Sequence, residues 1–396
     1  MMNAVIKQAF LIRLLLCFVH TESFAITQKS LLNKQRHSNW SLFGGANDLP
    51  TSYEWLAEEK DLDLDWLHPG SVLDNEYDGC IDDANIVQMS LYPLEACYIP
   101  LLQEGIDERE YAIIRNVEPQ NIKMALDLKQ KIDKEGSARF CAVLRANDTG
   151  RIATIGTSMR VVETEEQYLW DGKTIARIIL KCIPEDTVEI LNILNPKAWS
   201  RENRLLRSEE YLTANVVKFG DADLTSIVDN SAASEILLEY EAVKNIYETN
   251  DKVSSNFPPF ALKAISSLPS MGQIVDNETF WSAAHIWQKL CFTVKEARRV
   301  NLQSIVHEKT ISAAMKKGGP LNLPIHREDL PSDVRMELNE LEREEANNFI
   351  AIGMEPCLDF QKLLATKKLN DRITLFSKMI AKERTRLEEE IRTDTP

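Results

Sequence analysis

The chain lacks the short patterns that most directly indicate nucleotide or metal chemistry. It has no Gly-x-x-x-x-Gly-Lys-Ser/Thr sequence, in which backbone N–H groups and the lysine surround nucleotide phosphates. The nearest glycine cluster, Lys-Lys-Gly-Gly-Pro at residues 316–320, has its lysines before the glycines and a proline after them, which is typical of a helix stop. Cys-x-x-Cys and His-x-x-x-His spacings are also missing. The sequence therefore predicts no bound metal and no other cofactor.

Basic residues are the minority among the charged ones. The chain has 46 Lys and Arg against 61 Asp and Glu, a net charge of −15. Residues 1–46 hold five of the bases and one of the acids, so the remainder carries 41 bases and 60 acids, a net charge of −19. Phosphate backbones are bound through lysine and arginine with release of counterions. We therefore expect no nucleic-acid partner.

Long apolar runs are scarce, and the one at residues 9–19 is too short to span a bilayer but long enough for a signal peptide. Small residues at Ser23 and Ala25 permit cleavage near Phe24, and residues 24–47 hold no acid but several Lys, Arg and Ser, as in transit peptides. A phenylalanine directly behind the signal resembles the bipartite presequences of algae with complex plastids. Residues 1–47 are thus expected to direct import into the plastid stroma, with no membrane association after processing; plain secretion is the alternative.

The cysteines and the glycosylation sequons do little to decide between plastid import and secretion. Six cysteines follow Cys17, an even number that secretion could pair. Cys97, Cys141 and Cys182 nevertheless lie in apolar, strand-like runs, where a free cysteine behaves as a small hydrophobic residue. Glycans would be added to N-x-Ser/Thr sequons only on a secretory route. Three such sequons occur, at Asn39, Asn147 and Asn277.

Residues 86–225 have the pattern of a mostly β domain. Between residues 174 and 182, apolar side chains alternate with Arg177 and Lys181, the period of two of a half-buried strand. Turn sequences at 148–150 and 171–172 separate the apolar runs as hairpin loops do, and one helix is expected at 120–135. The preceding segment, 48–85, is predicted to be an acidic linker. Its tryptophans and leucines could fold back onto the domain as a short helix or strand.

Residues 226–396 predict a helical extension, because apolar residues recur at three- and four-residue steps from Ile236 to Tyr247, with Pro258-Pro259 closing that helix. Further helices are expected at 277–316, 331–352, 359–365 and 369–392. The last could form a coiled-coil seam, but packing onto the preceding helices is favoured. Its apolar stripe consists of Leu369, Ile373, Phe376, Ile380, Leu387 and Ile391.

Three motifs occur in order in the β region. Leu-Tyr-Pro-Leu-Glu-Ala-Cys-Tyr-Ile-Pro occupies residues 91–100, Glu118-Pro119 follows, and Phe-Cys-Ala-Val-Leu at 140–144 precedes Gly-Arg-Ile-Ala-Thr-Ile-Gly at 150–156. Together they resemble the amino-terminal, substrate-engaging domain of Lon-type proteases, and the likeness extends over about residues 86–390. The resemblance implies an α+β fold, namely a six-stranded, PUA-like β pseudo-barrel followed by helices.

The resemblance also implies a function. A complete Lon protease needs a phosphate-binding loop and a serine-lysine dyad, and neither is found, so a stand-alone form without ATPase and peptidase domains is expected. Such a domain would bind unfolded or client polypeptides without catalysis, in protein quality control or as an adaptor for a separate protease or chaperone. The alternatives are a noncatalytic subunit or assembly factor of a separate protease, and a secreted binding protein. PUA-like barrels elsewhere bind RNA, which the charge opposes.

The three motifs supply the candidate site residues. Client peptides could add along a strand edge or lie in an apolar groove. The candidates for that groove are Tyr92, Tyr98, Ile99 and Leu101, although packing in the core explains them equally well. A structural role is expected for Glu118, Pro119, Gly150 and Arg151, with Glu118 binding backbone N–H groups at the start of the helix.

Two further patterns resemble catalytic motifs, but both motifs are incomplete. Asp148-Thr149-Gly150 matches the triplet of aspartic peptidases, but no second copy is present to share a proton across a cleft. His307-Glu308 begins like His-Glu-x-x-His, but Ile311 stands where the second metal ligand is required. We therefore expect that the protein is not an enzyme.

Overall fold

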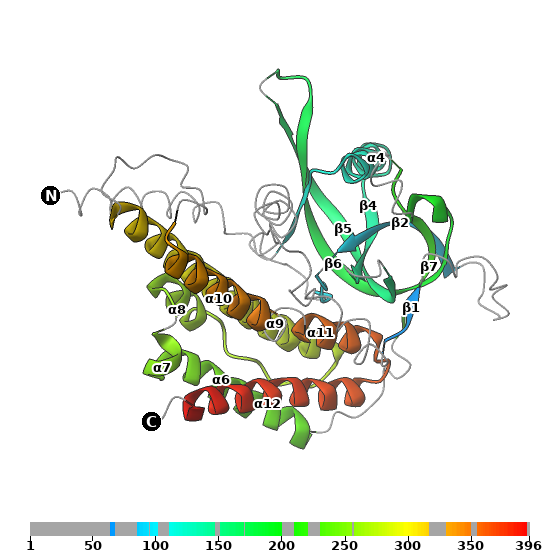
Figure 1. Cartoon of the computed structure of the whole chain (residues 1–396). Coiled ribbons are helices and arrows are strands. Elements are labelled where there is room, and N and C mark those ends of the chain that lie inside the picture. Colours follow the sequence, from blue (N-terminus) through cyan, green and yellow to red (C-terminus); the bar gives the residue numbers. More distant parts are fainter. Residues whose placement is uncertain are drawn as a thin grey trace.

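The computed structural model describes residues 64–67, 85–94, 96–101, 111–146, 151–169, 171–199, 210–220, 230–255, 257–316, 330–349 and 355–393. A β-barrel and a group of helices lie side by side (Figure 1). The fold is therefore mixed α+β, as predicted, and the helices dominate its C-terminal part. Among the described helices, none is both long and apolar enough to cross a membrane. The presequence at 1–47 and the predicted boundary at 225–226 lie outside the described residues.

Seven strands form one sheet in the described part of the chain. They are β1 (Trp66–Leu67), β2 (Ile86–Leu94), β3 (Ala112–Asn116), β4 (Ala138–Arg145), β5 (Ile152–Tyr168), β6 (Ile175–Ile193) and β7 (Thr213–Lys218). Their order is β1-β5-β4-β2-β7-β6-β3, and an additional pairing of β5 with β6 closes five of them into a barrel. The expected six strands are β2 to β7. The seventh, β1, is the part of the acidic segment that folds back, since Trp66 and Leu67 pair with β5.

The period of two in β6 places its side chains as predicted. Ile178, Leu180 and Cys182 are buried inside, whereas Arg177 and Lys181 lie on the other face and form polar contacts there. The two longest strands are β5, with 17 residues, and β6, with 19. Where β5 crosses β4, Gly156 allows close approach, because a Cβ there would lie 2.5 Å from Cys141 Sγ and 2.8 Å from Ala142 O.

One helix, α4 (Pro119–Glu135), packs against the barrel and fulfils the prediction for residues 120–135. Pro119 occupies the first turn, where its missing N–H costs no hydrogen bond. The helix ends at Gly136, which has the left-handed φ of 76° and donates its N–H to Ile132 O. Met124 and Leu128 are buried in a cluster with the inward-facing side chains of β2, β4 and β6.

The C-terminal part is helical. Its helices are α6 (Asn230–Thr249), α7 (Asp251–Ser254), α8 (Pro259–Ser266), α9 (Asn277–Lys316), α10 (Ser332–Phe349), α11 (Glu355–Ala365) and α12 (Leu369–Thr393), and the 3-10 turn η5 (Pro196–Trp199) precedes them in the chain. The prolines at 258 and 259 were expected only to end a helix. Instead Pro259 begins α8, because proline is well suited to the first turn of a helix.

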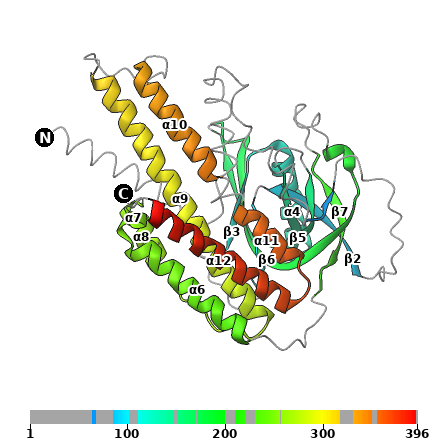
Figure 2. The same ribbon diagram turned by 60° about the horizontal axis from the view of Figure 1, so that its bottom comes forward.

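Figure 2 shows α12 lying along α6 and α9, with α11 between these helices and the sheet. The apolar stripe of α12 faces this interior, since Ile373, Phe376 and Ile380 are fully buried there. Phe376 also stacks edge-on against Phe280 of α9, with ring centroids 5.7 Å apart. The prediction that the stripe packs onto the preceding helices is therefore confirmed, in preference to the coiled-coil alternative.

Two buried glutamines join the helices to the barrel. Gln288 of α9 donates its side-chain N–H to Cys97 O at 3.0 Å, and Gln361 of α11 donates to Ile155 O in β5 at 2.8 Å. Around these bonds, the side chains of Ile99, Ile155 and the helices form one apolar cluster. The barrel and helices thus share a continuous core.

Candidate functional site

The four side chains predicted to line a peptide groove lie in or beside the interior. Tyr92 is 2% exposed and packs edge-on against Phe140, with centroids 6.1 Å apart, whereas Ile99 is 1% exposed and belongs to the helical core. Leu101 is buried and donates its backbone N–H to Pro184 O, and Tyr98 is partly buried beside the α4 cluster. These positions agree with the core-packing alternative, and a role in peptide binding stays a prediction.

Glu118 was expected to bind backbone N–H groups at the start of α4, and this expectation is wrong. It occupies the N-cap position, but its side chain makes no capping bond to the backbone. Its carboxylate instead accepts hydrogen bonds from the side-chain amides of Gln120 and Asn121, both at 3.1 Å. Pro119 has no N–H to offer, and the two amides that follow supply donors in its place.

Arg151 helps to hold β1 on the barrel. Its guanidinium lies 5.2 Å from the ring centre of Trp66, and its carbonyl accepts the backbone N–H of Ala146 at 2.9 Å, which closes the β4–β5 hairpin. Gly150 and Asp148 belong to the part of the turn outside the described residues. The contact between Arg151 and Trp66 could not be predicted from local sequence patterns, because the two residues lie far apart in the chain.

Three of the described cysteines, Cys97, Cys141 and Cys182, lack the environment of catalytic nucleophiles. Burial raises the pKa of Cys97 and Cys182 well above the usual value, and it raises the pKa of Cys141 to about 12. Thiols with raised pKa values stay protonated at neutral pH and react slowly. All five described cysteines are free thiols, and no group of three or more potential metal ligands occurs among the described residues.

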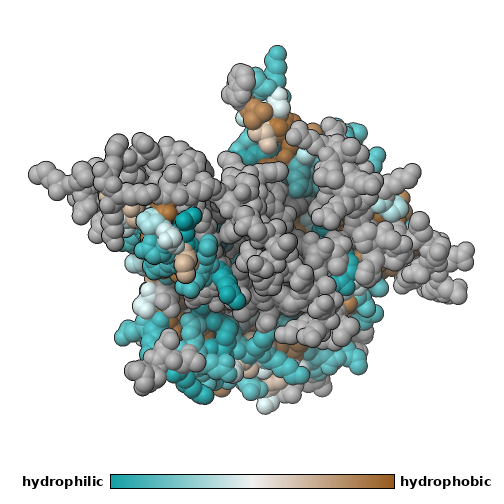
Figure 3. Space-filling view, in the orientation of Figure 1, coloured by the Kyte–Doolittle hydropathy of each residue, from teal (hydrophilic) through white to brown (hydrophobic). Residues whose placement is uncertain are grey.

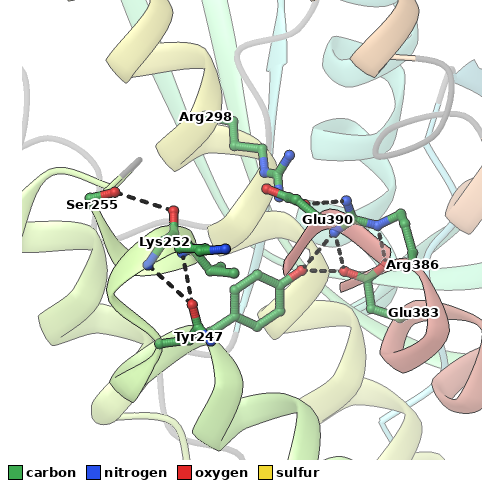
Figure 4. A network of polar contacts seen from close by, with 9 residues as sticks. Tyr247, Lys252, Ser255, Arg298, Glu383, Arg386 and Glu390 are labelled. Atoms are coloured by element: carbon green, nitrogen blue, oxygen red, sulfur yellow. Dashed lines mark hydrogen bonds and ion pairs between the residues drawn. The ribbon is translucent and has the colours of Figure 1, made fainter. Parts of the chain in front are cut away.

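A polar network joins three helices at the end of the helical part (Figure 4). Arg386 of α12 donates to Glu383 at 2.7 Å and to Glu390 at 3.0 Å, while Arg298 of α9 also donates to Glu390 at 3.0 Å. Tyr247 of α6 donates its hydroxyl to Glu383. Two cations and two anions thus balance one another, and we interpret the network as a structural connection among α6, α9 and α12.

An exposed candidate surface is the projecting hairpin, defined here as residues 162–168 of β5, residues 175–181 of β6 and the described turn residues between them. It extends past the rest of the barrel (Figure 1). The neighbouring strand β4 accompanies β5 only to Val161, which pairs with Ala138. Val162, Tyr168 and Leu169 are 39%, 49% and 46% exposed. In Figure 3 the tip of the hairpin presents brown, apolar atoms beside teal, polar ones.

Hydrogen bonds join the described residues of the turn of the projecting hairpin. Asp171 accepts the backbone N–H groups of Lys173 and Thr174, both at 2.9 Å, and Gly172 has a left-handed φ of 64°. The backbone N–H of Leu169 donates to Thr174 O at 2.8 Å. Hydrogen bonds from Thr174 lower the pKa of Asp171, which favours the ionised acceptor that the turn uses.

Charge is divided between the two strands of the projecting hairpin. Glu163, Glu165 and Glu166 lie on β5, whereas the bases lie on β6 and in the turn. Glu163 pairs with Lys181 at 2.6 Å, and a hydrogen bond from Lys129 of α4 lowers the pKa of Glu166, so that it stays ionised. Because β6 is flanked by β3 and β5, the acidic strand forms the outer edge of the hairpin.

The fold and this surface define an α+β protein with a closed barrel, a joined set of helices and an accessible hairpin. No family model matches the chain, and no curated protein does. Among solved structures, it is similar to the crystal structure of a Lon N-terminal domain protein from Xanthomonas campestris, with 14% identity and a TM-score of 0.27 over 39% of this chain and 72% of that one. It is also similar to the N-terminal domain of Mycobacterium avium complex Lon protease, with 7% identity and a TM-score of 0.28 over 55% of this chain and 97% of that one.

Proposed function

We propose that this protein binds unfolded or client polypeptides and performs no covalent chemistry. The observation that carries the proposal is the projecting hairpin, an accessible strand edge with exposed apolar side chains at Val162, Tyr168 and Leu169. Extended polypeptides recognise such edges through main-chain hydrogen bonds. The motifs at residues 91–100, 118–119 and 140–156, which resemble the substrate-engaging domain of Lon-type proteases, support the same function.

The cellular role that fits this activity is protein quality control in the plastid, where the protein would deliver clients to a separate protease or chaperone. The alternatives are a noncatalytic subunit or assembly factor of such a protease, and a secreted binding protein. The raised pKa values of the buried thiols Cys97, Cys141 and Cys182 support a noncatalytic function, since they leave these cysteines poorly suited to nucleophilic attack.

The full chain should bind a reduced, denatured model protein of basic charge more tightly than the native form of the same protein. Apolar contacts would supply most of the affinity, and the net charge of −15 would steer the encounter, so the association rate should fall as salt rises. Surface plasmon resonance with both forms of the client measures this difference.

Binding should be detectable at tens of micromolar client, which corresponds to roughly −6 to −7 kcal/mol. The same preparation should leave casein intact and should not consume ATP. If no unfolded client binds detectably, the proposed function is wrong. Cleavage of casein or hydrolysis of ATP would contradict the noncatalytic part of the proposal.

The proposed plastid location is tested separately. A fluorescent reporter fused behind residues 1–50 should reach the plastid of a diatom, because those residues combine an apolar signal with an acid-free, basic stretch. The same fusion with Phe24→Ala should stop before the innermost membranes. Accumulation of the unmodified fusion in the medium would favour the secretory alternative.

A further inference from the structure

We propose that client polypeptides dock as an added β-strand on the outer edge of β5, at residues 162–168, and that the docked segment alternates basic with apolar residues. This inference rests on the proposed function and adds to it a surface and a chemical preference. The occupant is therefore an extended, basic segment of an unfolded chain.

In the described part of the chain, the outer edge of β5 has no strand partner. On one side, β5 pairs with β6 through residues Glu163 to Tyr168. On the other side, β4 begins at Ala138, opposite Val161, and no described strand pairs with β5 beyond that point. A strand paired on only one side presents a row of N–H and C=O groups to solvent, and such a row is a template for another chain. An incoming strand would continue the line of β4 along β5.

The edge is already in the conformation that a docked strand needs. The hydrogen bonds of Asp171 connect residues of the turn, and the pairing with β6 holds residues 163–167 extended, with a register shift between Gln167 and Tyr168. The ion pair between Lys129 and Glu166 also ties the hairpin to α4. Because the edge is ordered before binding, less conformational entropy is lost when a client pairs with it.

The side chains of the edge specify the chemistry of the segment. Glu163 and Glu165 lie on the face that carries Lys181 and Ile179 of β6, and both glutamates are exposed. Adjacent strands place side chains of the same face next to each other, so a lysine or arginine at every second position would lie beside these carboxylates. Apolar residues at the positions between them would cover exposed apolar side chains such as Val162 and Tyr168.

The same charges disfavour a second copy of this chain as the occupant. Two outer edges paired with each other would bring the acidic residues of one copy, Glu163, Glu165 and Glu166, close to those of the other. Like charges on directly opposed strands are destabilising, and charged edge residues are a common protection against self-pairing. The outer edge of β5 thus disfavours pairing with a second copy of the chain and favours a basic partner.

The test uses the full chain and two fluorescent decapeptides, one alternating lysine with valine and one alternating glutamate with valine. Fluorescence anisotropy should show that the wild-type protein prefers the lysine peptide. The double substitution Glu163→Lys with Glu165→Lys should weaken lysine-peptide binding about tenfold and reverse the preference between the two peptides. Circular dichroism verifies that the variant is folded.

The matched control is Glu235→Lys with Glu241→Lys, which changes the net charge equally at two exposed positions of α6. This control should change the affinity less than about twofold, because distant surface charges are screened at physiological salt. A photoreactive version of the lysine peptide should crosslink to residues 162–168 when analysed by mass spectrometry.

The outcomes separate the two proposals. If the wild-type chain binds denatured clients, but the hairpin and α6 variants behave alike and the crosslinks lie elsewhere, the docking surface is wrong and the proposed function stands. If the wild-type chain binds no unfolded client at all, both fail. If the chain dimerises in solution through crosslinks within 162–168, a second copy occupies the edge and the basic client does not.

Discussion

Replacement of Arg372 by alanine is expected to lower the free energy of unfolding by about 2–5 kcal/mol, the range for replacing a large buried side chain by alanine. Arg372 is only 1% exposed and lies at the start of α12. It donates to Thr366 O at 2.6 Å and to Asn277 Oδ1 at 2.9 Å, and its guanidinium lies 4.8 Å from the ring centre of Trp281. Alanine would leave both acceptors without this donor and would open a cavity among three helices.

The matched control for this prediction is Arg384→Ala in the same helix. Arg384 is 41% exposed and pairs with Glu239 and Glu388 at the surface, so its loss should cost about 1 kcal/mol or less. Arg372→Lys should lie between the two, because lysine keeps the charge but cannot form the planar fork. Urea denaturation followed by circular dichroism measures all three variants. Equal costs for Arg372→Ala and Arg384→Ala would show that burial of Arg372 does not matter.

Gly156→Ala is expected to lower the free energy of unfolding by about 2–3 kcal/mol, as overpacking of a close-packed interior does. The added Cβ would lie 2.5 Å from Cys141 Sγ and 2.8 Å from Ala142 O. The carbonyl is part of β4 and cannot turn away, so the two strands would have to separate. Thermal unfolding should therefore begin at a clearly lower temperature in the variant.

Gly272→Ala is the control for this substitution, since a Cβ there would have nothing within 4 Å. It should leave the stability nearly unchanged. Adding Cys141→Ala to Gly156→Ala should recover only part of the loss, because the contact with the Ala142 carbonyl remains. Full recovery would mean that the thiol alone, and not the approach of the two strands, requires glycine at this position.

Local sequence patterns predicted the elements whose signal is contained within one segment. The alternation at residues 174–182 correctly placed Ile178 and Leu180 inside the barrel, and the periodicity of α12 correctly placed Phe376 in the helical core. The expected helix at 277–316 coincides with α9. Each of these patterns indicates which face of a helix or strand is buried. That face is determined by the residues of the segment itself.

Features that depend on the orientation of individual side chains, or on where a neighbouring strand ends, could not be predicted in this way. The carboxylate of Glu118 accepts hydrogen bonds from two side-chain amides. Its negative charge alone had predicted hydrogen bonds from the backbone N–H groups at the start of α4. The projecting hairpin was also missed as a site, because residues 163–167 are polar and draw no attention as a binding surface. The sequence nevertheless contained one indication of the hairpin. The strand-like residues that flank the turn at Asp171-Gly172 form a longer stretch than strand β4.

The length of β5 has a mechanical consequence. One strand runs from Ile155, whose carbonyl is held by Gln361 of α11, to the exposed edge at residues 162–168. The bonds of an antiparallel ladder lie perpendicular to its strands, so tension along β5 would load many of them at the same time instead of opening them one by one. A chain pulled away from the hairpin would thus transmit force through the barrel to α11 before the hairpin detached.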